Sequence, residues 1–298
     1  MVFSRSAATA IGLGAIVLWS SLATLTAMSG RVPPFELLAI TFGIGGLAGV
    51  ALWPLRPGAI RALRQPLPVW LLGVGGLFGY HAAYFVALRS APVVESGLIN
   101  YLWPLLIVIF SALLPGERLK WQHLAGAVLA LVGAVLAVTG EQGFAIAPQY
   151  LGGYAAAFAA ALIWAGYSVL SRRVATVPSD AITGYCLVTA ILAAIVHVAV
   201  EPTIWPDGPA PWAAAIALGL GPVGLAFYLW DLGVKHGEIQ ALGALSYLTP
   251  LVSTGLLLAF GYGAFTPALV VATILIVAGA ALAAGGLFFG RNRGASAA

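Results

Sequence analysis

Long apolar stretches separated by short polar turns dominate the sequence. A membrane-spanning helix needs about 20 consecutive, mostly apolar residues. Ten stretches meet this requirement, at approximately residues 9–28, 35–53, 69–88, 95–114, 122–140, 151–170, 181–200, 212–232, 239–260 and 267–289. The pattern therefore predicts an all-α membrane protein with ten transmembrane helices. The first stretch is too long for the apolar core of a signal peptide, so we expect it to be retained.

The pattern also occurs twice. The segment Tyr101–Leu105 (YLWPL) is followed by Tyr247–Leu251 (YLTPL), 146 positions later in a chain of 298 residues. Each half holds five predicted spans, an odd number, so the second half must cross the membrane upside down relative to the first. We predict two inverted five-helix repeats, at residues 1–145 and 146–298. This architecture is typical of secondary transporters, with the substrate near the midplane between the repeats. The alternative is a duplication that built only a scaffold.

Composition strengthens the membrane assignment. Hydrophobic residues make up 61% of the chain and charged residues 7%, whereas soluble domains contain about 25% charged residues. Most of the surface must therefore face lipid. The net charge of +4 is spread over short loops and does not indicate a nucleic-acid partner. The chain has one cysteine, Cys186, which excludes a framework of internal disulfides.

Basic residues alternate between the predicted loops. Short cytoplasmic loops of membrane proteins are enriched in Lys and Arg. Of the 13 basic residues, 11 fall on one predicted side: Arg5, Arg56, Arg61, Arg64, Arg118, Lys120, Arg172, Arg173, Lys235, Arg291 and Arg293. Only Arg31 and Arg89 fall on the other side. We therefore expect both termini to be cytoplasmic, which requires an even number of spans.

The third predicted helix carries the first candidate site residues. Tyr80, His81 and Tyr84 follow a glycine-rich segment near the middle of the membrane. An ionisable residue at this depth is expensive and is commonly functional. We therefore predict that these three rings contact substrate. The alternative is a neutral histidine bonded to a neighbouring helix.

The two proline-containing segments carry the next candidates. Ser96, Asn100 and Trp103 share one helix face, with Tyr101 about 100° away. Because proline lacks an N–H, we expect Pro104 to free the carbonyl of Asn100, and Pro250 to free the carbonyl of Ser246. Broken backbone at membrane depth is tolerated only inside protein or beside a cavity. We predict a binding surface at Asn100, Tyr101, Trp103, Ser246 and Tyr247, with Pro104 and Pro250 as hinges. A passive kink is the alternative.

The sixth and eighth helices add polar stripes. Trp164, Tyr167, Ser168 and Ser171 lie on one face, which should turn toward protein or a wet cavity. The serines can instead bond to the preceding turn of their own helix. We predict substrate contacts for Trp164, Ser168 and Tyr228. Asp231 and Lys235 are four positions apart, which favours a salt bridge over a proton-carrying carboxylate.

These features together resemble a known superfamily. The chain resembles the drug/metabolite transporter superfamily, with one EamA-type domain per half. The resemblance rests on ten spans in two halves, on Pro104 followed by Leu114-Pro115-Gly116-Glu117-Arg118-Leu119, and on Pro250 in the second half. The second half departs from this pattern, because Gly261-Tyr262-Gly263 has no glutamate at the corresponding place. This leaves Glu117 without a shared role; it can simply cap a short loop.

The resemblance implies a substrate class. Within the superfamily, the chain most resembles the YddG-type exporters, which carry aromatic and other neutral amino acids out of bacteria. This closer resemblance rests on Tyr80, His81, Tyr84, Tyr101, Trp103 and Trp164. This implies a secondary transporter in the bacterial inner membrane that works by alternating access. The alternative is an exporter of the same superfamily that carries another small organic solute or a drug.

Other functions lack their sequence requirements. An intramembrane enzyme needs a nucleophile–base pair or metal ligands at depth, and the histidines are not placed for this. A channel is distinguished from a carrier by non-saturating flux. We expect no metal and no cofactor. The expected partners are an amino-acid substrate and the lipid bilayer, with the chain acting as a monomer or homodimer. Facilitated diffusion and proton coupling both fit the sequence.

Overall fold

A computed structural model describes residues 4–140, 146–259 and 266–289. Within these ranges the chain forms helices joined by short turns, without strands. Eight helical stretches are long and apolar enough to cross a membrane, and the two apolar stretches Ile239–Ser253 and Pro267–Ala283 are shorter. The predicted all-α fold is confirmed, and the ends of the ten predicted segments match those of the helices within about four residues.

The first five spans contain three interrupted helices. The short 3-10 segments η1 (Trp53–Leu55) and η2 (Ala59–Leu63) lie in the turn after the second span. The spans are α1 (Arg5–Ser20) with α2 (Leu22–Met28); α3 (Pro34–Ala51); α4 (Leu67–Val74), the π-helical turn η3 (Gly75–Gly79) and α5 (Tyr80–Ser90); α6 (Val93–Asn100) with α7 (Trp103–Ser111); and α8 (Trp121–Thr139).

The last five spans follow the same order. A 3-10 turn, η4 (Pro148–Tyr150), precedes them. The spans are α9 (Leu151–Arg173); α10 (Ala181–Val200); α11 (Pro209–Leu220), the π-helical turn η5 (Gly221–Leu225) and α12 (Ala226–His236); α13 (Ile239–Leu245) with α14 (Leu248–Ala259); and α15 (Pro267–Phe289).

The packing of these spans follows a two-fold pattern. The second span packs on the seventh (α3 on α10) and the fifth on the tenth (α8 on α15), so each meets its own equivalent. The first span packs on the eighth (α1 on α12), and the third on the sixth (α5 on α9). A two-fold rotation that exchanges the halves turns each of these last two pairs into the other. The two five-helix repeats are therefore related by a pseudo-two-fold axis.

The closest crossing lies between α8 and α15. A Cβ atom added to Gly126 would lie 2.5 Å from the carbonyl oxygen of Gly279, and the reverse distance is also 2.5 Å. Further along α8, a Cβ added to Gly133 would lie 2.9 Å from the carbonyl oxygen of Ala272. The residue numbers rise on one helix as they fall on the other, so these equivalent helices run antiparallel. This is the packing that inverted repeats require.

The breaks in the helices also repeat. The π-helical turns Gly75–Gly79 and Gly221–Leu225 are 146 positions apart. The fourth span is interrupted after Asn100 and the ninth after Leu245, each shortly before the proline of its repeat. Such interruptions are common at functional sites inside membrane bundles. One expectation was wrong: the carbonyl of Ser246 is not freed, because it accepts a 3.0 Å hydrogen bond from the backbone N–H of Thr249.

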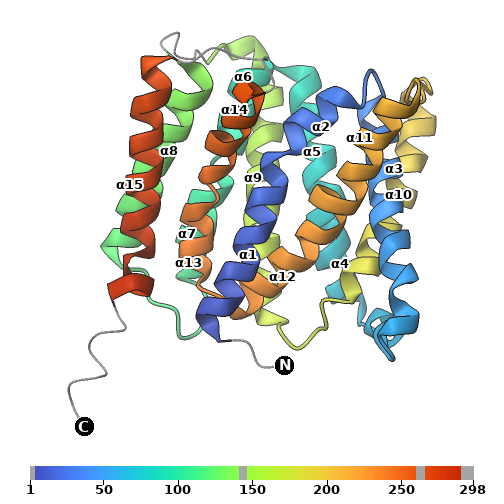
Figure 1. Cartoon of the computed structure of the whole chain (residues 1–298), viewed down its shortest axis with the longest axis horizontal. Helices are drawn as coiled ribbons and strands as arrows, with labels where there is room; N and C mark the ends of the chain where they lie inside the picture. Colours follow the sequence, from blue (N-terminus) through green and yellow to red (C-terminus); the bar gives the residue numbers. More distant parts are fainter. Residues whose placement is uncertain (1–3, 141–145, 260–265, 290–298) are drawn as a thin grey trace.

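The bundle has two ends, which we name by an arginine at each. Helix α1 begins and α15 ends at the same end of the molecule (Figure 1). We call it the Arg5 end, and the opposite end, where α5 finishes, the Arg89 end. The predicted ion pair is confirmed, with 2.8 Å between Lys235 Nζ and Asp231 Oδ2 near the Arg5 end. The segment at residues 261–263 and the bases Arg291 and Arg293 lie outside the described residues.

The glycine crossing gives a stability prediction. Gly126→Ala should destabilise the protein by about 1–3 kcal/mol, because the methyl group pushes α8 away from α15. Gly166→Ala is the control, since a Cβ at this mid-helix glycine of α9 meets nothing within 4 Å. The control should be neutral or slightly stabilising, because alanine has the higher helix propensity. Thermal unfolding in detergent measures both; equal midpoints for the two variants would contradict the tight crossing.

Candidate functional site

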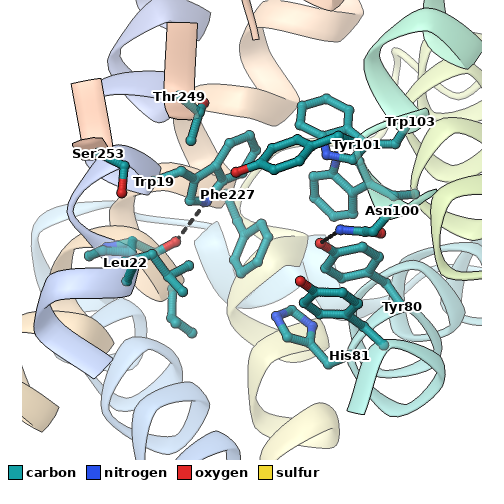
Figure 2. A pocket seen from close by; sticks show the side chains of 15 residues that line it. Trp19, Leu22, Tyr80, His81, Asn100, Tyr101, Trp103, Phe227, Thr249 and Ser253 are labelled. Atoms are coloured by element: carbon teal, nitrogen blue, oxygen red, sulfur yellow. Dashed lines mark hydrogen bonds between the residues drawn. The ribbon is translucent and has the colours of Figure 1, made fainter. Parts of the chain in front are cut away.

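A central cavity lies where the interrupted spans meet. Its volume is about 240 Å³. Figure 2 shows its lining, which comes from the first, third, fourth, sixth, eighth and ninth spans: Trp19, Leu22, Ala23, Tyr80, His81, Tyr84, Asn100, Tyr101, Trp103, Trp164, Pro222, Val223, Phe227, Thr249 and Ser253. Both repeats therefore contribute to one site, as expected for a binding site on the pseudo-two-fold axis.

The start of α5 supplies three of the rings. Tyr80 and Tyr84 lie one turn apart and stack, with ring centroids 6.1 Å apart and planes 15° apart. His81 lies beside them and places its Nδ1 atom 2.7 Å from the carbonyl oxygen of Leu77 in the π-helical turn. A carbonyl oxygen only accepts hydrogen bonds, so Nδ1 carries the hydrogen. In the neutral ring, Nε2 is then the acceptor.

The interruption of the fourth span supplies the next group. Asn100, the last residue of α6, donates from Nδ2 to the Tyr80 hydroxyl oxygen at 3.1 Å (Figure 2). The amide thus ties α6 to α5 and leaves the Tyr80 hydrogen available to another acceptor. Trp103 begins α7 and is buried. Asn100 and Trp103 thus lie on either side of the break, and both contact rings of other spans.

Four tryptophans close one side of the cavity. The Trp164 ring lies 5.5 Å from Trp19, 6.3 Å from Trp103 and 6.2 Å from Trp230 between centroids. Phe227 packs against the same group, 5.8 Å from Trp164. Edge-to-face, tilted and stacked ring pairs of this kind contribute about 0.5–1.5 kcal/mol each beyond the burial of their area. The rings therefore form a firm apolar wall.

The two π-helical turns hold rings in the same way. Trp19 donates from Nε1 to the carbonyl oxygen of Pro222 in η5 at 2.9 Å (Figure 2). His81 bonds to the carbonyl oxygen of Leu77 in η3. Pro222 and Leu77 occupy neighbouring positions of equivalent turns. Each π-helical turn thus fixes the orientation of one cavity ring.

The cavity carries no formal charge on its described lining. Its polar groups are the tyrosine hydroxyls, His81, Asn100, Thr249 and Ser253. The buried Thr249 Oγ1 and Asn100 Oδ1 atoms have no hydrogen-bond partner among the described residues. Buried polar atoms are normally satisfied, so a polar solute or water has bonds to make here.

Most of the predicted site residues meet in this cavity. Seven of them line it: Tyr80, His81, Tyr84, Asn100, Tyr101, Trp103 and Trp164. The four others lie outside the lining. Ser168 accepts from Trp230 Nε1, Tyr228 bonds to Thr183, Ser246 donates to the Leu242 carbonyl oxygen, and Tyr247 accepts from the Leu105 N–H.

The predicted hinges lie beside the cavity. Pro104 occupies the first turn of α7, where its missing N–H costs no helical bond. Pro250 lies in the first turn of α14, next to the lining residue Thr249. The hinge role itself stays a prediction.

Sequence reasoning missed several lining residues that the repeat identifies. Phe227 is 146 positions after His81, Thr249 is 146 after Trp103, and Pro222 is 146 after Gly76. Trp19 is 145 positions before Trp164. Projecting His81 and Trp103 onto the second repeat, and Trp164 onto the first, would therefore have found Phe227, Thr249 and Trp19.

Comparisons with known proteins agree with this architecture. The EamA-like transporter family matches twice, at residues 6–139 and 151–285. The aromatic amino acid exporter YddG of Ancylobacter novellus is 54% identical over 281 residues, covering 94% of this chain and 98% of that protein. The aromatic amino acid exporter YddG of Escherichia coli is 29% identical, covering 85% of this chain and 88% of that protein.

A solved structure matches the whole bundle. A protein crystal structure with 53% sequence identity superimposes with a TM-score of 0.92, covering 97% of this chain and 99% of that chain. The two family matches together span most of the sequence. This multi-pass membrane protein therefore belongs to the EamA-like transporter family.

Proposed function

We propose that this protein exports aromatic and other neutral amino acids across the bacterial inner membrane by alternating access. The observation that carries the proposal is the uncharged, ring-lined cavity between the two repeats. The relatives named as aromatic amino acid exporters support the same substrate class.

The wall of the cavity suits an apolar side chain. Tyr80, Trp19, Trp164 and Phe227 present ring faces and edges to a volume of about 240 Å³. A flat aromatic ring gains both burial and ring–ring contacts in such a wall. A strongly charged side chain would lose its hydration without gaining an opposite charge.

The polar groups suit a zwitterionic head group. The Nε2 atom of His81 is an acceptor available to an ammonium group, because Nδ1 is committed to Leu77. The hydroxyls of Tyr80, Tyr84 and Tyr101 can donate to a carboxylate. Neutral partners of this kind bind both charges of an amino acid without selecting for net charge.

The distribution of basic residues suggests the direction of transport. The Arg5 end carries Arg5, Arg56, Arg118 and Lys120, so we assign it to the cytoplasm, with both termini there. Leu22, at the start of α2, lines the cavity and is exposed. We infer that the cavity opens toward the Arg89 end, which is the outside of the cell in this assignment.

The function is tested by reconstitution. Liposomes containing the purified protein should take up labelled tryptophan or phenylalanine with saturation, and preloaded unlabelled substrate should accelerate exchange. Counterflow of this kind marks a carrier, whereas a channel gives non-saturating flux. A pH gradient applied in parallel separates facilitated diffusion from proton coupling. Absence of saturable flux for every neutral amino acid would reject the proposal.

His81 provides a test of head-group recognition. His81→Phe keeps a ring against Phe42, whose centroid is 5.3 Å away, but removes the acceptor nitrogen. A lost hydrogen bond of about 1.4 kcal/mol corresponds to a roughly tenfold rise in KM. His236→Gln, at an exposed position at the end of α12, is the control and should leave KM unchanged. An unchanged KM in a folded His81→Phe variant would remove His81 from the site.

The prolines provide a test of the hinges. Pro104→Ala and Pro250→Ala restore a backbone N–H and favour continuous helices through the breaks. We expect both variants to slow turnover more than they weaken substrate binding, because the stiffened spans resist the change of conformation. Steady-state kcat and equilibrium binding measure the two effects separately. Wild-type turnover in both variants would contradict the hinge role.

A further inference from the structure

The cavity is closed toward the Arg5 end by buried rings. Trp103, Trp164 and Trp230 have exposed fractions of 6%, 4% and 0%. Trp230 is further fixed by a 3.0 Å hydrogen bond from Nε1 to Ser168 Oγ. A solute in the cavity therefore has no route to the Arg5 end unless these rings separate.

Beyond the rings, α7 and α13 pack tightly across the repeat boundary. Tyr247 is fully buried, and its hydroxyl oxygen accepts a 3.2 Å hydrogen bond from the backbone N–H of Leu105. A Cβ added to Gly243 would lie 3.0 Å from the carbonyl oxygen of Pro104. These contacts must also break before the cavity opens toward the Arg5 end.

A polar cluster centred on Glu117 lies at the same end. Glu117 Oε1 accepts from Arg5 Nη2 at 2.6 Å and from Arg172 Nη2 at 2.7 Å. Its other oxygen, Oε2, accepts from Gln240 Nε2 at 3.0 Å. Arg5 also pairs with Glu238, with 2.7 Å between Nε and Oε1. One carboxylate thus joins three partners.

The partners of Glu117 belong to different elements. Arg5 begins α1, Arg172 lies at the end of α9, and Gln240 lies in α13. Arg172 also donates from Nη1 to the carbonyl oxygens of Val234 and Gly237, at 3.1 and 2.7 Å. The cluster therefore ties parts of both repeats together at the Arg5 end.

The surroundings keep Glu117 ionised. Burial alone raises the pKa of its carboxyl, but the bond from Gln240 and the charges of Arg172 and Arg5 outweigh burial and lower the pKa below its usual value. Charge-assisted hydrogen bonds to an ionised carboxylate are about twice as strong as neutral ones. The cluster is thus a strong link that depends on the charge of one residue.

We propose that Glu117 latches the Arg5 end shut, and that its release from Arg5 and Arg172 is required for the cavity to open there. The latch rests on the proposed alternating-access function, because its elements must separate only if the cavity opens at both ends. It gives Glu117 a specific role in place of a simple loop cap.

Two further features agree with a latch. A polar cavity of about 280 Å³ lies at the cluster, lined in part by Arg118, Lys120 and His123. Water in this cavity can solvate the charges when the latch opens. The position equivalent to Glu117 in the second repeat is Gly263, which has no carboxylate. The same latch therefore cannot form at the Arg89 end, so the two ends are held by different contacts.

The test is thiol accessibility rather than transport. Ser246→Cys, in a Cys186→Ser background, places one thiol at a fully buried position between the cavity and the latch. An impermeant thiol reagent is added to inside-out and right-side-out membrane vesicles. Adding Glu117→Gln should raise the labelling rate about tenfold in inside-out vesicles, where the reagent meets the Arg5 end.

Two further variants sharpen the result. Arg118→Gln removes a neighbouring charge that is not among the hydrogen-bond or ion-pair partners of Glu117 in the described part of the chain, and it should leave labelling unchanged. Gln240→Leu removes only the neutral partner of the latch, and we expect a two- to fourfold rise. This milder change keeps the test available if Glu117→Gln fails to fold.

The outcomes separate the latch from the proposed function. Unchanged labelling in folded Glu117→Gln and Gln240→Leu variants overturns the latch, and so does an equal rise with Arg118→Gln. If labelling rises as expected but the wild-type protein carries no amino acid in liposomes, the latch stands and the substrate proposal fails.

Discussion

The antiparallel crossing of α8 with α15 at Gly126 and Gly279 is the constraint from which the rest of the bundle follows. Lipid gives helices little hydrophobic reason to associate, so close backbone packing must hold them. The two glycines allow an approach that any Cβ would prevent. Because α15 is the repeat equivalent of α8, this crossing lies on the pseudo-two-fold axis. The same axis then requires α1 to meet α12 wherever α5 meets α9, and it brings the broken fourth and ninth spans together.

Equivalent breaks in the two repeats serve different purposes. Tyr101 lines the cavity, whereas its equivalent Tyr247 is buried and bonded to the Leu105 N–H. Trp103 is one of the buried rings that close the cavity, whereas Thr249 lines the cavity with a buried hydroxyl that has no hydrogen-bond partner within the described residues. A symmetric sequence pattern thus produces unequal contacts at the two breaks. Two repeats in unequal conformations are what alternating access needs, because exchanging their conformations moves the opening to the other end.

The sequence predicted the spans, the repeat and most of the lining because these depend on local periodicity and on counting. Tyr80, His81 and Asn100 stood out as polar groups in apolar helices, and the structure brings them together. The sequence could not predict that Ser246 bonds to its own helix or that Tyr228 pairs with Thr183. Helical spacing alone does not show which way a polar face turns. Nor could it predict the Glu117 cluster, whose partners are up to 123 positions away in the chain. The repeat was a usable but unused signal for Phe227 and Thr249.

The placement of charge explains how such a protein can bind and move with so few charged residues. The described lining of the cavity offers neutral donors and acceptors, so the proposed amino-acid substrate would enter and leave without breaking an ion pair there. The ion pairs lie toward the ends of the bundle, as Arg5 with Glu117 and Arg89 with Glu201 show. Separating an ion pair deep in a low-dielectric interior costs several kcal/mol, whereas water replaces most of the attraction near the surface. The proposed Glu117 latch lies beside a polar cavity. It is therefore strong enough to hold the Arg5 end shut and weak enough to be released in each transport cycle.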